Sequence, residues 1–129
     1  MSDQAKTQIT GVHTVAVPVT DQDRALEFYT GALGLTKRLD VRYGQGGRWI
    51  EVAPPGGETT IALVRSGPGV PAGVETGIRL TARDADELHT VLLASGVDAD
   101  PEVLRWPGVP PMFAFRDPDA NRLEIIEWA

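Results

Sequence analysis

The stretch that decides the fold spans residues 17–35 and reads VPVTDQDRALEFYTGALGL. The stretch begins within a run of alternating valines, Val15, Val17 and Val19. Thr20 and Asp21 come next, and their side chains are suited to capping a helix. Apolar residues then recur at helical spacing until Gly34, a residue type that commonly ends a helix. The pattern predicts a strand over residues 10–19, followed directly by a helix.

The same pattern recurs 63 residues later, where Asp84 follows a second strand-like run over residues 75–82. The same offset relates two turns, since Pro55 of the first half corresponds to Pro118 of the second. An internal repeat of this kind indicates two copies of one supersecondary unit.

Each copy reads as a strand, a helix and three further strands. In the first copy we expect the later strands over residues 36–43, 48–53 and 59–65. In the second copy a helix from Asp84 to about Ser95 precedes strands near residues 102–104, 112–116 and 122–127. The sequence thus predicts an α+β fold of two tandem βαβββ modules. We expect a disordered N-terminus at 1–8 and one domain at 9–128, with module 1 at 9–65, a linker at 66–73 and module 2 at 74–128.

Composition narrows the possible functions. A chain of 129 residues with 42% hydrophobic residues can build one core, and the absence of cysteine excludes thiol chemistry and disulfides. The net charge of −6, with basic residues scattered along the chain, argues against nucleic acid as a partner. The polar start shows neither a signal peptide nor a membrane span, so we expect a cytoplasmic protein that does not enter a membrane.

Two segments resemble the signatures of the vicinal oxygen chelate (VOC) superfamily: residues 17–35 and the run FRDPDANRLEIIE at 115–127. This superfamily contains glyoxalase I, extradiol dioxygenases and the bleomycin and fosfomycin resistance proteins. The resemblance covers residues 9–128 and implies the glyoxalase/bleomycin resistance/dihydroxybiphenyl dioxygenase fold, whose sheets curl into a cup around a ligand. It also implies a homodimer, because partner chains commonly complete the cup. The reaction stays open, since one such scaffold carries many functions.

Metal-binding relatives place His or Glu ligands at four positions that face into the cup. Alignment on the helix-capping aspartate puts these positions at Thr14, Ile61, Gly77 and Glu124. The first three offer no usable ligand set, so we expect no cofactor. His13 lies one residue earlier, on the helix-facing side by alternation, unless Pro18 introduces a bulge. A divalent metal held by His13 and Glu124 is the alternative.

Strand alternation also predicts which residues face the cup. The expected ligand-binding residues are Tyr43, Trp49, Glu51, Arg79, Trp106 and Met112. Trp49, Tyr43 and Met112, with Trp106 in a stiff proline-rich loop, are candidates for a stacking platform, and ordinary burial is the alternative. Glu51 is nearer a loop, so we expect it to be solvated.

Glu124 is the candidate catalytic residue. It lies mid-strand with cup-facing parity, and a buried carboxylate must be paired or hydrogen-bonded. A structural ion pair with Arg79 and a role as general acid or base are both open. For His89 we expect a position at a helix edge without chemistry, and for Trp128 ordinary burial or a subunit contact.

Two function hypotheses follow. The first is a metal-independent binding protein that holds a small apolar or aromatic molecule in the cup. The alternative is a VOC enzyme of the lyase, isomerase or dioxygenase type, either metal-dependent or using Glu124 as acid/base with Arg79 stabilising an oxyanion. The sequence alone leaves open whether the protein is an enzyme.

Overall fold

The chain is described by a computed structural model over residues 7–128, so residues 1–6 of the expected N-terminal disorder lie outside the described range. Module 1 contains β1 (Thr14–Val19), α1 (Gln22–Glu27), a π-helical turn (Phe28–Ala32), β2 (Thr36–Tyr43), β3 (Gly47–Ala53) and β4 (Thr60–Arg65). Module 2 contains β5 (Glu75–Ala82), α2 (Ala85–Ala94), β6 (Asp98–Ala99), β7 (Leu104–Trp106), β8 (Val109–Arg116) and β9 (Arg122–Glu127).

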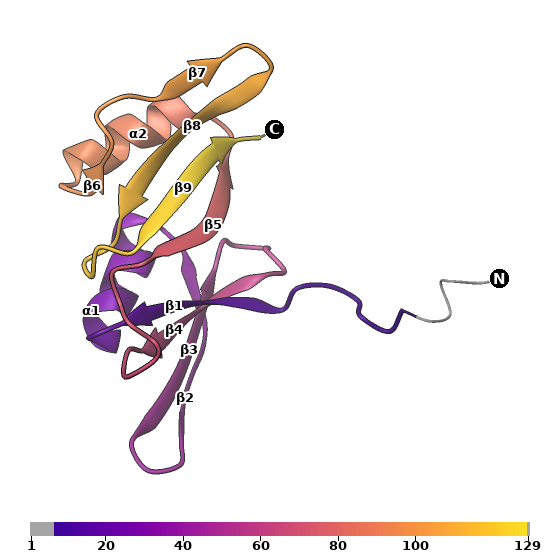
Figure 1. The fold of residues 1–129 in the computed structure, drawn as a ribbon, viewed down its shortest axis with the longest axis vertical. Coiled ribbons are helices and arrows are strands. Elements are labelled where there is room, and N and C mark those ends of the chain that lie inside the picture. The colour runs from indigo at the N-terminus through magenta and orange to yellow at the C-terminus, as the bar shows by residue number, and fades with distance from the viewer. Residues whose placement is uncertain (1–6, 129) are drawn as a thin grey trace.

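Each module builds its own sheet (Figure 1). The strand orders are β1-β4-β3-β2 and β5-β9-β8-β6, and β7 pairs with β8. The pairs β1–β4 and β5–β9 are parallel, whereas the other pairs are antiparallel. The predicted α+β fold of two βαβββ modules is therefore confirmed. Neither α1 nor α2, nor any other helix within residues 7–128, has the length and apolar character needed to cross a bilayer.

The repeat extends to the hydrogen bonds at the helix starts. The side chain of Asp21 accepts a hydrogen bond from the N–H of Arg24, and that of Asp84 accepts one from the N–H of Glu87; both bonds are 3.0 Å long. These are the N-cap bonds that the sequence predicts. The copies differ further on, because α1 continues into the π-helical turn before Gly34 (φ 71°), whereas α2 stays α-helical to Ala94.

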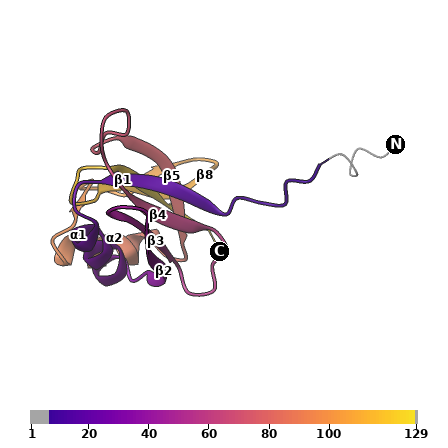
Figure 2. The ribbon, with the colours of Figure 1, turned by 90° about the horizontal axis from the view of Figure 1, so that it is seen from below.

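Both modules contribute to one hydrophobic core. The helices lie next to each other on one side of the sheets (Figure 2), and Phe28 of module 1 meets Phe115 of module 2 with ring centroids 6.5 Å apart. Tyr29 is fully buried and its hydroxyl donates to Asp117 over 2.8 Å. Asn121, also fully buried, donates to the carbonyl of Pro18 over 2.7 Å. The turn after β8 is thus bonded to module 1.

Three strands, β1, β7 and β8, start two or more residues from their expected positions, and the short β6 is not among the predicted strands. The first strand begins at Thr14 and not at residue 10. β8 begins at Val109 and includes two of the prolines that we had assigned to a loop. β8 tolerates these prolines because it pairs with β9 only from Met112 onward. The prolines therefore lie in a part of β8 that has no hydrogen-bonded neighbour on the β9 side. Trp106 consequently lies in β7, opposite Val109.

Candidate functional site

The sheet face of module 1 that points away from the helices carries exposed apolar side chains. Leu39, Val41 and Tyr43 of β2 are 39%, 43% and 58% exposed. On the neighbouring strand Val41 lies opposite Trp49, and Leu39 lies opposite Glu51. We call these five residues the module-1 face. It combines an apolar and aromatic surface with a single carboxylate.

Glu51 is the polar centre of this face. Its side chain accepts hydrogen bonds from Trp49 Nε1 (2.7 Å) and from the hydroxyl of Thr60 (2.9 Å). The residue is only 5% exposed, so our expectation that it is solvated is wrong. Its partners compensate its burial: the bonds from Trp49 and Thr60, together with His13, hold the pKa of Glu51 below its ordinary value, while burial acts in the opposite direction. Glu51 stays an ionised acceptor.

His13 also reaches Glu51. Its Nε2 lies 3.3 Å from Oε2 of Glu51, on the module-1 face. Strand alternation predicts that His13 faces the helix side, and this prediction is wrong: His13 precedes β1, and its ring contacts Glu51 while its carbonyl accepts the N–H of Thr60. The imidazole is attached loosely, since its side chain is 77% exposed.

Trp49 and Tyr43 line a pocket of about 400 Å³ at the β2–β3 hairpin, together with Arg48 and Gln22. Gln22 is buried and donates to the carbonyls of Arg48 and Leu63, each over 2.9 Å. The hairpin is thereby anchored to the start of α1. The fold thus fixes the hairpin that carries Tyr43 and Trp49, two of the residues expected to form a stacking platform.

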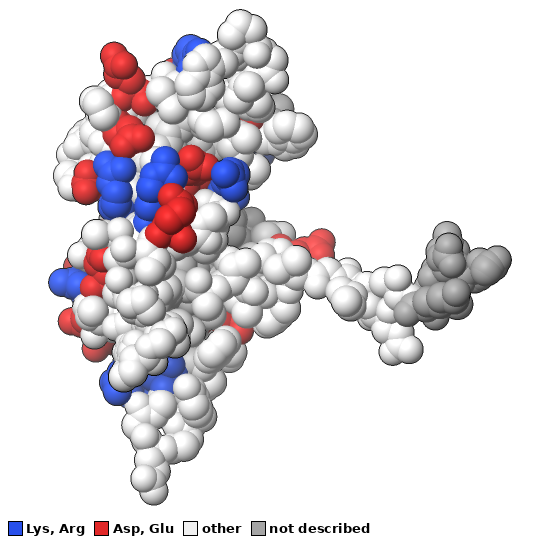
Figure 3. All heavy atoms as spheres, viewed as in Figure 1, with Lys and Arg blue, Asp and Glu red and all other residues white. Residues whose placement is uncertain are grey.

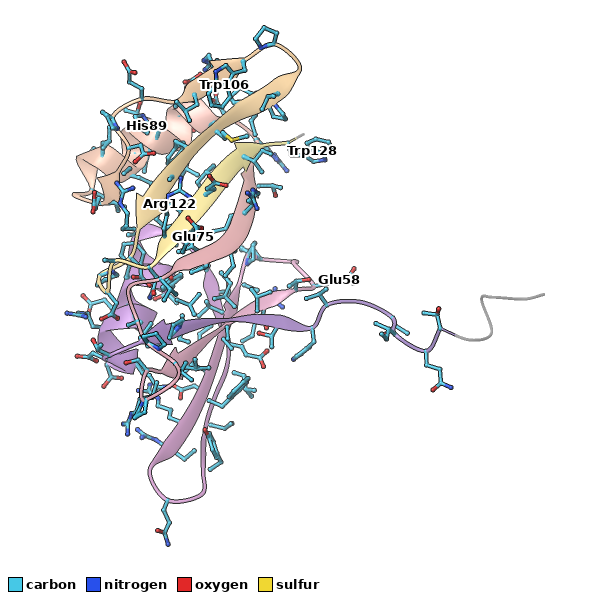
Figure 4. All side chains as sticks on the ribbon, viewed as in Figure 1. Glu58, Glu75, His89, Trp106, Arg122 and Trp128 are labelled. Carbon is cyan, nitrogen blue, oxygen red and sulfur yellow. The ribbon has the colours of Figure 1, made fainter. Side chains whose placement is uncertain are left out.

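The corresponding face of module 2 is charged. Arg79 Nε lies 2.9 Å from Oε1 of Glu124, and Arg122 Nη2 lies 3.3 Å from Oε2. The predicted pair of Arg79 with Glu124 is therefore present. Arg122 also meets Glu75 at 2.6 Å, and Figure 4 shows these two side chains together on the open face. Each oxygen of the candidate catalytic carboxylate meets an arginine.

Further ion pairs continue this charged face across β8. Arg116 bonds to Asp100 over 2.9 Å and to Asp98 over 3.0 Å, and it lowers the pKa of Asp98. Figure 3 shows the result as a band of mixed charge over module 2. We call the seven residues of this band the module-2 face: Glu75, Arg79, Asp98, Asp100, Arg116, Arg122 and Glu124. Every arginine in this group has a carboxylate partner.

Between the modules runs an apolar groove of about 830 Å³. Its lining includes Val15 and Leu35 from module 1 and Ile78 and Leu80 from module 2, with Arg79 among its polar members. Trp49, Glu51 and Glu124 are not among its lining residues. The groove therefore shares Arg79 with the module-2 face, and it approaches the module-1 face only through Thr60, which donates to Glu51.

The expected binding residues thus lie in two groups, one on each sheet. Tyr43, Trp49 and Glu51 lie on the module-1 sheet, whereas Arg79, Trp106 and Met112 lie on the module-2 sheet. Trp106 is 56% exposed at the β7–β8 end, where Figure 4 labels it.

Two residues outside the predicted site also differ from their expected surroundings. His89 is buried, with Nε2 2.6 Å from the carbonyl of Asp100 and its ring against Phe113. It fastens α2 to the sheet and is not at an open helix edge. Trp128 is 65% exposed, so it is not buried within the chain.

The four metal-ligand positions do not fit a metal. The hydroxyl of Thr14 donates to the carbonyl of Thr60, Gly77 has no side chain, and Glu124 is held by arginines. The position that the sequence assigns to Ile61 belongs to Ala62 instead. Ala62 lies opposite Glu51 in module 1, and Glu124 lies opposite Ala114, the equivalent of Glu51, in module 2. The turn at residues 54–59 is one residue longer than its counterpart at 117–121, which shifts the repeat. Within residues 7–128, no group of three or more His, Cys, Asp or Glu side chains is placed to hold a metal ion.

Tandem βαβββ modules with helices on one face and an uncovered second face define the glyoxalase-type architecture. Residues 11–125 match the family described as the Glyoxalase/Bleomycin resistance protein/Dioxygenase superfamily, and the chain belongs to this superfamily. The resemblance inferred from the sequence is confirmed.

Solved structures agree with this assignment. TnmS3 from Streptomyces sp. CB03234, described as an antibiotic binding protein, is 32% identical with a TM-score of 0.84, over 95% of this chain and 99% of its own. A superfamily member from Sphaerobacter thermophilus is 34% identical with a TM-score of 0.89, over 95% of this chain and all of its own. YetH of Bacillus subtilis (strain 168), whose function is uncharacterised, is 40% identical over 52 residues, which span 40% of this chain and 43% of YetH.

Proposed function

We propose that this protein binds a small apolar or aromatic molecule on its open sheet faces and does so without a metal ion. The observation that carries the proposal is the module-1 face, where Leu39, Val41 and Tyr43 stay exposed beside Trp49. Exposed apolar side chains that gather on one surface are typical of interaction sites. The similarity to TnmS3, an antibiotic binding protein, supports the same function class.

Binding needs no acid/base group, whereas the enzyme alternative needs one that can exchange a proton. Glu124 lies between Arg79 and Arg122, so each of its carboxylate oxygens is already engaged in an ion pair. The ion pairs therefore support a positioning role for Glu124 over proton transfer.

A thermal-shift screen tests the proposal. A library of planar aromatic compounds, including antibiotics with fused aromatic rings, should contain members that raise the melting temperature in a concentration-dependent way, because they bind only the native state. Hits should be recovered chemically unchanged after long incubation. A hit that is converted to product would support the enzyme alternative, and a library without hits would count against binding.

We also propose that the protein works as a symmetric homodimer. Support comes from the two separate faces of one chain and from the apolar groove between the modules, since a second copy can cover such a groove and complete a cup. Multi-angle light scattering at micromolar concentration should give twice the mass of the 13.9 kDa chain. A monomeric mass would overturn this part of the proposal.

A further inference from the structure

We propose that Glu51 is the polar anchor of the binding site and selects planar aromatic ligands that carry a hydrogen-bond donor, such as a phenolic hydroxyl or an N–H group. The inference deepens the proposed function and rests on it. It assigns the ligand's donor group to Oε2 of Glu51, at the position where the ring of His13 now lies.

The three partners of Glu51 are not equivalent. Trp49 Nε1 and the hydroxyl of Thr60 donate at 2.7 and 2.9 Å, within the normal range for hydrogen bonds. His13 stands off at 3.3 Å, outside that range, and its side chain is 77% exposed. Moving His13 into solvent therefore costs little buried surface, and Oε2 then has an acceptor site free.

The geometry also fits a flat ring. The indole of Trp49 is tied to the same oxygen through Nε1, so its plane is fixed before any ligand arrives. Val41 lies opposite it and Leu39 lies opposite Glu51, both exposed. A ring stacked on this surface places its donor group near Glu51, and fixing the platform in advance reduces the entropy lost on binding.

Charge sets the selectivity. An ionised carboxylate accepts hydrogen bonds and donates none. Because Glu51 is 5% exposed, water screens it poorly, so a ligand carboxylate at this point would be repelled. Donor-bearing rings should bind best, rings with only an acceptor less well, and anionic rings least.

Three matched probes test this order by isothermal titration calorimetry: 2-naphthol, 2-methoxynaphthalene and 2-naphthoate. We expect 2-naphthol to bind about tenfold more tightly than the methyl ether, as for a hydrogen bond to a charged group, and the carboxylate to bind most weakly. Equal affinities, or tightest binding of 2-naphthoate, would overturn the anchor while leaving small-molecule binding intact. Absence of binding by all three probes would overturn both.

Variants locate the effect. Glu51→Gln should remove most of the preference for 2-naphthol over its methyl ether. The control is Glu58→Gln, which alters an exposed carboxylate in the β3–β4 turn and should retain the preference. His13→Ala alters an exposed side chain, so it should fold, and it should bind 2-naphthol at least as tightly as the parent. Weaker binding of 2-naphthol by His13→Ala would overturn the displacement of His13, because the imidazole itself would then contact the ligand.

Discussion

The two modules have the same fold and opposite surface chemistry. Trp49 of module 1 corresponds to Met112 of module 2, and Glu51 corresponds to Ala114, 63 residues later in each case. In the last strands the relation reverses, with Ala62 in module 1 where Glu124 stands in module 2. Both helix-facing sides bury apolar residues. The difference teaches that the core restricts one side of each sheet and leaves the other free to acquire binding chemistry.

The charged side chains of the module-2 face form ion pairs with one another, whereas the apolar side chains of the module-1 face stay exposed to solvent. Arg79, Arg116 and Arg122 each meet carboxylates within the chain, and ion pairs open to water contribute about 0–1 kcal/mol each. Leu39, Val41 and Tyr43 of the module-1 face remain exposed to solvent. For the proposed ligand, we expect covering the exposed apolar side chains of module 1 to contribute more than separating the ion pairs of module 2.

The largest predicted effect concerns Asn121, whose bond to Pro18 is one of the links between the two modules. Asn121→Ala should lower the free energy of unfolding by about 3 kcal/mol, because the fully buried Asn121 side chain loses its hydrogen bonds with Pro18, Asp117, Gly73 and Val74. Urea denaturation followed by circular dichroism measures the loss. The exposed hairpin substitution Gln45→Ala is the control and should change little. An unchanged midpoint for Asn121→Ala would show that the modules do not depend on this link.

Trp49 and Met112 occupy equivalent positions on the two sheets, so substituting each of them compares the modules directly. Trp49→Ala should weaken ligand binding by about 1–3 kcal/mol, as for an aromatic anchor, and Met112→Ala should weaken it less. Trp128→Ala, at an exposed position near the C-terminus, should leave affinity unchanged. Calorimetry with a ligand from the thermal-shift screen measures all three. Equal losses at Trp49 and Met112 would mean that both faces bind the ligand to the same extent.

Much of the fold was predictable because it depends on local signals. The capping aspartates, the glycines after the helices and the strand alternation give the two modules, and β5 and β9 have the predicted bounds. The Trp49–Glu51 contact was also within reach, since residues two apart on a strand share a face. The parts that failed depend on tertiary structure. His13 contacts a residue 38 positions away, and the longer β3–β4 turn displaces the repeat by one residue.

Acid should weaken the folded state in part through Glu51 of the module-1 face. Its pKa is lowered in the folded protein, so its ionised form contributes stability at neutral pH that is lost as the pH falls through the folded-state pKa, below the ordinary value of 4.5. Glu51→Gln removes this contribution, so the unfolding free energy of the variant should fall less steeply with decreasing pH. Urea titrations between pH 7 and the acid limit of folding measure the slopes. Glu58→Gln, which alters an exposed carboxylate, should keep the slope of the parent.

The smallest expected effect is that of added metal ions, which should not change the melting temperature. Since Thr14, Ala62 and Gly77 carry no ligand set and Glu124 is held by arginines, adding zinc, nickel, iron or manganese should leave the melting temperature unchanged. A metal bound only by the native state, at 100 times its Kd, would stabilise by about 2.7 kcal/mol and raise the melting temperature by roughly 10 °C. Such a rise, abolished by His13→Ala or Glu124→Ala, would establish the alternative site. A rise that survives both substitutions would place a metal elsewhere, and the assignment of the two faces would then need revision.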